Sequence, residues 1–373
     1  MILKKILCLT LTCVLFATTV SCNKSNVSKN SNDNQNTSKD TITVTDHLGY
    51  KVEVPTEIDS IAIGAIYPLP SVISIFFDSA DILKGIPEPC MSAAKNSLLG
   101  ELYPEILNAD TGYINGANLN IEALLELNPD VYIYNAADVQ HGELCRKAGI
   151  PAVAVSVNKW DYDAIVTLTN WIDLLSEMFP KYEKKDLVDQ YSKDVLARIN
   201  DKTKNLPSED KKNLFFLFQH SDTMITTSGN HFFGQWWADA VGANNVGKEI
   251  EKDNSVAVNM EDIYRWNPEC ILITNFTASQ PESLYNDSKW AEIDAVKNKR
   301  VYKMPLGMYR SYTCGVDTPV TLLWIAKTVY PDLFADIDIL EETKKYYKDV
   351  FDVELTNDQA AKIFAPSSNA SAF

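Results

Sequence analysis

Short apolar runs alternate with segments of helical patterning along most of the chain. Apolar runs bounded by turn residues predict buried strands at 60–65, 82–87, 131–135, 152–156, 213–219, 270–275 and 301–304. Helices are predicted between and after them, at 70–77, 94–107, 120–127, 138–148, 233–243, 261–266, 318–328, 341–349 and 357–363. Strands that alternate with helices form a parallel sheet covered on both faces, so the pattern predicts an α/β protein.

The alternation occurs in two halves separated by a long charged segment at about 181–200. Within it, Val188, Tyr191, Val195 and Ile199 recur at three- or four-residue spacing, which indicates a helix with one apolar stripe. We therefore expect two lobes, each with a central, mostly parallel sheet covered by helices, and a ligand cleft between them. The predicted boundaries are an N-terminal lobe at 41–178, a connecting helix at 179–205, a C-terminal lobe at 206–334, and C-terminal helices with a tail at 335–373.

The N-terminal lobe should open with a β-hairpin. Residues 41–55 alternate apolar and polar side chains around the turn His47–Tyr50. His47 lies at the predicted tip, where we expect it to be solvated.

One phrase occurs twice, 139 positions apart: Asn-x-Glu, then Asn-Pro-acid six residues after the Glu, then an apolar run. Its residues are Asn120, Glu122, Asn128, Pro129 and Asp130 in one copy and Asn259, Glu261, Asn267, Pro268 and Glu269 in the other. The first asparagine of each copy suits a helix N-cap, and the proline cannot continue a helix. The repeat therefore predicts an equivalent helix running into a central strand in each lobe.

Glu122 and Glu261 each fall in the first turn of a predicted helix, which allows two interpretations. An acid there simply suits the positive end of the helix dipole. Alternatively, the matched positions present two acidic side chains at a fixed separation, which would suit a symmetric basic partner.

The start of the chain has the pattern of a secretory signal peptide at 1–21. Lys4 and Lys5 precede an apolar stretch, and Thr-Val-Ser-Cys at its end resembles a bacterial lipobox. Cys22 would then be lipidated; an ordinary signal with a coincidental cysteine is the alternative. Residues 22–40 are almost entirely polar and predict a flexible tether.

The formal net charge of −16 argues against partners that bind through clustered lysine and arginine, such as nucleic acid, and against anionic lipid. Four cysteines follow the signal, Cys90, Cys145, Cys270 and Cys314, without a C-x-x-C pair. They signal neither a zinc site nor a dense disulfide framework, but they leave single disulfides open. The common nucleophile, phosphate-loop and zinc-protease motifs are absent from the sequence, so we do not expect an enzyme.

The segments TITVTDHLGYKVEVP, NIEALLELNPDVYIY, AGIPAVAVS, VNMEDIYRWNPECILI and AVKNKRVYKMP together resemble substrate-binding lipoproteins of metal-chelate ABC importers. That helical-backbone group includes siderophore-, haem- and cobalamin-binding proteins. The resemblance covers about 41–334. It implies a rigid connecting helix, anchoring to the outer face of the cell membrane through Cys22, and docking of Glu122 and Glu261 onto arginines of a permease dimer that works with an ATPase.

The resemblance also implies a small-molecule metal chelate as the ligand. We expect a ferric siderophore or haem, with a cobamide or a molybdate- or tungstate-type oxyanion as alternatives. A ligand-sensing ectodomain without a transport role is the rival function. No resident cofactor is expected.

Ligands of α/β proteins bind at the carboxyl ends of the strands. This rule selects the ligand-binding candidates Tyr67, Glu88, Asn135, His220, Asn275, Tyr309, Arg310 and Tyr312. The planar guanidinium of Arg310 suits carboxylate, catecholate or phosphate oxygen. The four histidines form no local cluster, so no side-chain metal site is expected.

Overall fold

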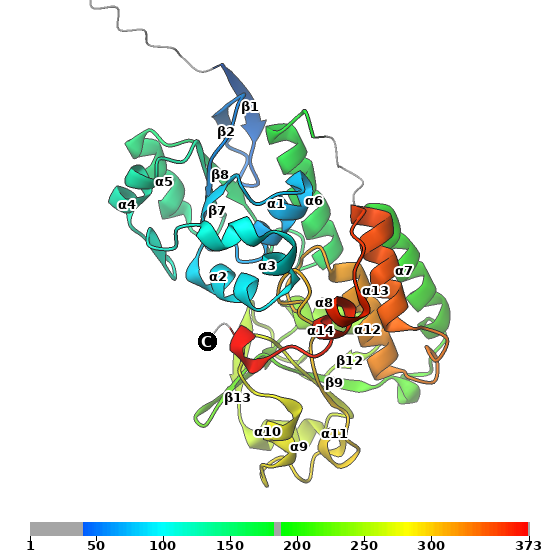
Figure 1. Ribbon diagram of the computed structural model, residues 1–373. Helices are drawn as coiled ribbons and strands as arrows, with labels where there is room; N and C mark the ends of the chain where they lie inside the picture. The colour runs from blue at the N-terminus through cyan, green and yellow to red at the C-terminus, as the bar shows by residue number, and fades with distance from the viewer. Residues whose placement is uncertain (1–39, 183–187, 372–373) are drawn as a thin grey trace, which may run out of the picture. The chain divides into compact units, whose positions relative to one another are not determined.

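The computed structural model describes residues 40–182 and 188–371 (Figure 1). The predicted signal peptide, the lipidation of Cys22 and nearly all of the tether lie outside the described residues. Within the described residues, no helix is long and apolar enough to cross a membrane. The four cysteines of this part are all buried and free, so none of them forms a disulfide.

The N-terminal lobe is built on a four-stranded parallel sheet in the order β4-β3-β7-β8. The strands are β3 (Ile61–Ile63), β4 (Leu83–Gly85), β7 (Val131–Asn135) and β8 (Ala152–Val155). Its helices are α1 (Leu69–Phe77), α2 (Glu88–Lys95), α3 (Leu98–Leu102), α4 (Ile121–Leu127), α5 (Val139–Ala148) and α6 (Ala164–Met178), with a 3-10 helix at Pro104–Asn108. The predicted hairpin is present as β1 (Thr41–Thr45) and β2 (Lys51–Pro55), and a shorter one forms from β5 (Ile114–Asn115) and β6 (Asn118–Leu119).

The C-terminal lobe repeats this topology with a parallel sheet in the order β12-β9-β14-β15. The strands are β9 (Asn213–Leu217), β12 (Asn244–Asn245), β14 (Cys270–Ile273) and β15 (Val301–Lys303). An antiparallel sheet joins β10 (Gln219–Ser221), β11 (Met224–Ser228) and β13 (Ser255–Val258). The helices are α8 (Phe233–Ala240), α9 (Met260–Trp266), α10 (Pro281–Tyr285), α11 (Asp294–Lys297), α12 (Thr318–Val329), α13 (Ile339–Phe351) and α14 (Asn357–Ile363), with 3-10 helices at Ser208–Asp210 and Ser368–Ala370.

When the strands of each sheet are numbered along the chain, both sheets have the spatial order 2-1-3-4. The predicted fold class, two α/β lobes on parallel sheets, is confirmed. Successive residues of a central strand face opposite sides of its sheet. In β7, Val131 and Ile133 join the large core while Tyr132 and Tyr134 join a smaller one under α4 and α5. In β14, Cys270 and Leu272 face the large core.

Helix α7 (Asp189–Thr203) carries the predicted apolar stripe, and Val195 and Ile199 are fully buried. It packs against α12, and Arg198 forms an ion pair with Glu342 of α13 at 2.6 Å. The predicted connecting segment 179–205 is described only in part, because 183–187 lie outside the described residues.

One helix prediction needs correction, and helix α6 was not predicted. The helix predicted at 94–107 is instead α2, α3 and a 3-10 turn, because Asn96 and Ser97 end one helix and cap the next, and Pro104 prevents α3 from continuing. No element was predicted where α6 lies. Its buried residues surround most of the helix, so it lacks a one-sided stripe.

Candidate functional site

The repeated phrase forms the same capped helix in both lobes. The Asn120 side chain accepts hydrogen bonds from the backbone N–H of Glu122 and Ala123 at the start of α4. Asn259 accepts one from Asp262 at the start of α9. The second asparagine of each phrase ends its helix in the left-handed region, with φ of 50° at Asn128 and 40° at Asn267. Asparagine tolerates that conformation, which explains why it recurs there.

The acid that follows the proline ties each repeat to the neighbouring strand. Oδ2 of Asp130 accepts from the backbone N–H of Ser60, just before β3, at 3.1 Å. Oε2 of Glu269 accepts from the backbone N–H of Asn213, the first residue of β9, at 3.1 Å. Strands β3 and β9 occupy the same place in their sheets. The repeat is thus a structural unit that joins β7 to β3 in one sheet and β14 to β9 in the other.

Glu122 and Glu261 serve none of these structural roles. Both side chains are exposed in the first turn of their helices, and neither carboxylate has a hydrogen-bond or ion-pair partner within 40–182 and 188–371. They remain free to bind another molecule.

Arg310 lies in the loop after β15 and bridges distant parts of the chain. It is 1% exposed. Its Nε donates to the carbonyl of Ala370 at 2.9 Å, and its Nη1 donates to the carbonyl of Pro89 at 2.8 Å and to the Tyr309 hydroxyl at 2.9 Å. Pro89 belongs to α2 of the N-terminal lobe, so this one side chain connects the two lobes.

The same region holds buried polar groups that have no partner. The Nη2 of Arg310, both amide atoms of Asn275 and the Ser311 hydroxyl make no hydrogen bond to the described residues. Asn275 precedes Phe276, whose ring centre lies 5.6 Å from the Arg310 guanidinium carbon. A buried donor without a partner is costly, so each of these groups suits a bound water molecule or a ligand that satisfies it. We call Asn275, Arg310 and Ser311 the strand-end cluster.

Lys303 holds the loop that carries Asn275. Its buried Nζ donates to the carbonyls of Thr274, Thr277 and Ser279 at 2.9, 2.7 and 2.8 Å. Burial lowers the pKa of Lys303 to about 7. The three carbonyls come from the loop after β14, so the β15 side chain fixes the conformation of its neighbour.

Asp317 holds the loop that carries Arg310. Its Oδ2 accepts from the backbone N–H of Met308 at 2.6 Å, and its Oδ1 accepts from the Tyr347 hydroxyl. Burial raises the pKa of Asp317 to about 6, while these donors oppose the rise. Gly307 is required beside it, because a Cβ there would lie 2.5 Å from the carboxylate.

Tyr309 lies within this region, and Tyr67 lies near it from the N-terminal lobe. Burial raises the pKa of the Tyr309 phenol, Arg310 opposes the rise, and Cys90 and Tyr67 are near enough to add to it. The Tyr67 carbonyl accepts from the Cys90 thiol at 3.2 Å. Tyr67, Tyr309 and Arg310 therefore lie close together where the lobes meet.

The other ligand-binding candidates lie in different settings. Asn135 uses its amide within its own lobe, donating to the Ala65 carbonyl at 3.2 Å. Glu88 is exposed at the first residue of α2. The Tyr312 ring is fully buried, and its hydroxyl accepts from the backbone N–H of Gly234 at 3.1 Å, which fixes the start of α8.

The histidines that the structure describes include His220 and His47, and each has a hydrogen-bond partner within its own lobe. His220 pairs its Nδ1 with the Ser279 hydroxyl at 2.9 Å and packs edge-on against Trp290. The expectation that His47 is solvated is wrong: its Nδ1 accepts from the backbone N–H of Ser156 at 3.0 Å, and burial, with Lys159 nearby, lowers its pKa to about 4. Among the described residues, no group of three or more His, Cys, Asp or Glu side chains could hold a metal ion.

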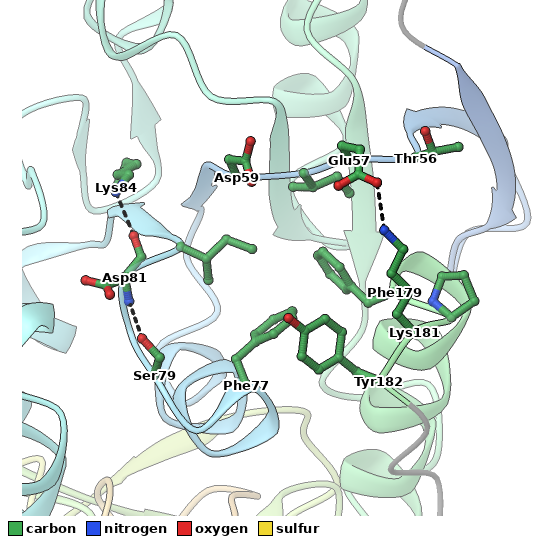
Figure 2. A pocket seen from close by; sticks show the side chains of 13 residues that line it. Thr56, Glu57, Asp59, Phe77, Ser79, Asp81, Lys84, Phe179, Lys181 and Tyr182 are labelled. Carbon is green, nitrogen blue, oxygen red and sulfur yellow. Dashed lines mark hydrogen bonds and ion pairs between the residues drawn. The ribbon is translucent and has the colours of Figure 1, made fainter.

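A cavity of about 420 Å³ lies elsewhere in the N-terminal lobe (Figure 2). It is lined by Asp59 and Ile82, which precede β3 and β4, and by Phe77, Phe179 and Tyr182. This is the amino end of the sheet, opposite to the end where α/β proteins bind ligands. None of the predicted ligand residues lines it.

Sequence reasoning missed three residues of this region: Lys303, Ser311 and Asp317. Lys303 carried a usable signal, because it is a charged residue in an otherwise apolar strand segment, VYKMP. Ser311 and Asp317 had none, since a serine and an aspartate in a loop are ordinary.

This chain is similar to a family of known proteins and to several of their members. The family model described as "Periplasmic binding protein" matches residues 77–306. The molybdate-binding protein MolA of Haemophilus influenzae is 28% identical over 347 residues, covering 86% of this chain and 93% of that protein. An uncharacterized ABC transporter substrate-binding lipoprotein of Bacillus subtilis, YvrC, is 24% identical over 228 residues, covering 60% and 69%. The crystal structure of a periplasmic solute binding protein from Veillonella parvula matches with a TM-score of 0.77 and 29% identity, covering 90% of this chain and all of that one.

Proposed function

This chain belongs to the periplasmic binding protein family, and from that membership we propose that it captures a small oxyanion of the molybdate or tungstate type and delivers it to an ABC importer. One observation carries the choice of ligand. Arg310, Asn275 and Ser311, in the loops that follow the neighbouring strands β14 and β15, have buried hydrogen-bonding groups without a partner among the described residues, and Arg310 also bonds across the lobes. An oxyanion is compact and offers acceptors on every side, so it can satisfy the donors among them at once.

The charges of the region favour an anion. Arg310 brings a buried guanidinium cation, Lys303 an amine that burial leaves only partly charged near pH 7, and Asp317 one buried acid. The chain as a whole carries a formal net charge of −16, which repels anions at long range. Affinity must therefore come from the local donors rather than from electrostatic steering. The similarity to the molybdate-binding protein of Haemophilus influenzae supports the same ligand class.

The iron chelate expected from the sequence is less well supported. A haem would need an axial ligand, and His220 already pairs its Nδ1 with the Ser279 hydroxyl and packs against Trp290. A siderophore could use Arg310, but its bulk is poorly matched to groups that are almost completely buried. We therefore prefer the oxyanion.

A ligand screen tests this proposal. Purified protein would be titrated with molybdate, tungstate, sulfate, phosphate, haemin, ferric siderophores and cobalamin, following thermal unfolding and tryptophan fluorescence. A ligand at 100 times its dissociation constant stabilises the folded state by about 2.7 kcal/mol. We expect that response from molybdate or tungstate. A response confined to haemin, a siderophore or cobalamin would overturn the proposal and restore the chelate.

We further propose that Glu122 and Glu261 dock on basic side chains of the permease. Their matched and exposed positions, without a partner in the part of the chain that the structure describes, support this role. Replacing both by alanine should abolish molybdate uptake by cells while the affinity of the purified protein for molybdate stays unchanged. Unchanged uptake would refute docking through these two glutamates.

Anchoring through Cys22 is also part of the proposal. It rests on the lipobox-like residues that precede this cysteine. Substituting Cys22→Ala should release the protein from the membrane fraction, and mass spectrometry of the N-terminal peptide should detect acyl chains only on the wild type.

A further inference from the structure

The two copies of the repeated phrase share one more feature, which neither capping nor strand pairing explains. Leu125 and Tyr264 occupy equivalent positions, each three residues after the docking glutamate of its helix. Both are 46% exposed. The preceding residues, Leu124 and Ile263, are both fully buried. The two helices therefore present the same sequence of buried and exposed apolar positions.

Spacing places each apolar side chain beside its glutamate. Residues three apart on an α-helix are neighbours on its surface. Leu125 thus adjoins Glu122 on α4, and Tyr264 adjoins Glu261 on α9. Each lobe carries a patch made of one carboxylate and one large apolar side chain.

Packing within the chain does not account for this exposure. Single exposed apolar residues are ordinary on protein surfaces, and other examples here include Val139 and Leu144 of α5. What is unusual is a pair at equivalent positions, each next to an unpartnered acid. The Tyr264 hydroxyl donates to the Lys289 carbonyl at 2.6 Å, which holds its half-exposed ring in a fixed orientation.

The patch on the C-terminal lobe also adjoins a hollow. A cavity of about 250 Å³ is lined by Met260, which precedes Glu261, and by Lys289, which accepts the Tyr264 hydrogen bond. Met224, 41% exposed, forms another part of its wall. A partner meeting Glu261 and Tyr264 would find an adjacent recess for a side chain of its own.

We propose that Leu125 and Tyr264 are matched apolar anchors of the surface that docks on the permease dimer, each entering an apolar socket beside the basic side chain that pairs with the glutamate. The inference rests on the proposed function, because the occupant is the importer. Each patch offers an acid, which suits a basic partner. The patch also occurs twice, once on each lobe, which suits two equivalent membrane subunits.

The two kinds of side chain should act on different rate constants. Exposed charges at the rim of an interface mainly speed association and make it sensitive to salt, whereas apolar anchors that become buried mainly slow dissociation. The glutamates and the apolar anchors can therefore be separated by kinetics.

The test measures binding of the full-length protein to its cognate permease–ATPase complex in lipid nanodiscs. The double variant Leu125→Ala, Tyr264→Ala should raise the dissociation rate at least tenfold while the association rate and the affinity for molybdate stay within twofold of wild type. Tyr264→Phe keeps the ring and should dissociate like the wild type. The matched control Val139→Ala, Leu144→Ala removes apolar side chains of similar exposure outside the repeat and should have no effect.

The outcomes separate this inference from the proposal on which it rests. If Glu122→Ala, Glu261→Ala slows association while the apolar variant dissociates normally, the anchors are refuted and glutamate docking stands. If the control pair raises the dissociation rate as much as the anchor pair, the effect is not specific to the repeat and the inference fails. If wild-type protein does not bind the complex at all, both the importer function and the anchors are overturned.

Discussion

Replacing Asn275 by leucine should stabilise the ligand-free protein and at the same time weaken its binding of molybdate. Asn275 is 1% exposed, and neither atom of its amide has a partner among the described residues. A buried polar group left unsatisfied costs about 1–3 kcal/mol, whereas an apolar side chain of the same shape carries no such cost. Leucine is nearly isosteric with asparagine, so we expect the free energy of unfolding to rise by about 2 kcal/mol.

Asn245 provides a matched control in the same lobe. It is also completely buried, but its amide nitrogen donates to the carbonyls of Ser228 and Gly229 and to the Gln235 side chain, and its oxygen accepts from the backbone N–H of Gly247 at 3.1 Å. Leucine at this position would leave those groups without partners. Asn245→Leu should therefore lower the free energy of unfolding by at least about 2 kcal/mol.

Urea unfolding followed by tryptophan fluorescence measures both changes at pH 7.5 without ligand, and calorimetry measures the affinity for molybdate. The expected result for Asn275→Leu is a higher free energy of unfolding together with an affinity for molybdate that is at least tenfold lower. A loss of stability as large as that of Asn245→Leu would show that the Asn275 amide is already satisfied in the ligand-free protein. That result would refute the argument that the strand-end cluster is kept for a ligand.

Three further predictions follow from Arg310, Asp317 and His47. Arg310→Lys keeps the charge but loses the guanidinium fork, and with it one or two charge-assisted hydrogen bonds. The affinity for molybdate, measured by calorimetry, should therefore fall about 10- to 100-fold, whereas the control Arg198→Lys should leave that affinity unchanged. The Asp317 carboxyl has a pKa of about 6 in the folded state against an ordinary value of 3.8, so its contribution to stability is present below pH 3.8 and is lost as the pH rises through 6. Relative to Asp317→Asn, the wild type should gain about 2 kcal/mol in urea unfolding between pH 7.5 and pH 4.5, and a constant difference would contradict the raised pKa. For His47 the sign is reversed, because its pKa is lowered to about 4: relative to His47→Asn, the wild type should lose stability as the pH falls from 6.5 towards 4.

The elements that the sequence predicted well are those defined by local chemistry. Strand 131–135 is present with those bounds, and the helix predicted at 120–127 begins one residue later. In both cases the signals lie within a few residues: an apolar run, an asparagine cap and a proline. The same local signals account for the second repeat, where α9 is Met260–Trp266.

The prediction that His47 is solvated failed because of residues far along the chain, Ser156 and Lys159. The rule that ligands bind at strand ends selected Asn275 and Arg310, whose role in ligand binding stays a prediction. The same rule selected Tyr312. Its ring packs against Phe216 and Phe218 in the core. Loop residues have no fixed period, so sequence spacing does not tell which of them face a site and which face the core.

If Arg310 binds the ligand as proposed, its contacts would link ligand binding to the contact between the lobes. Two of its nitrogens bond to the Pro89 carbonyl of the N-terminal lobe and to the Ala370 carbonyl near the end of the chain, while the third is unused. An anion bound to that third nitrogen would restrain the guanidinium that joins the lobes. Ligand and lobe contact would then stabilise each other by the same free energy, as reciprocal coupling requires. Losing the Pro89 contact should therefore weaken binding even though Pro89 offers the ligand no side-chain donor.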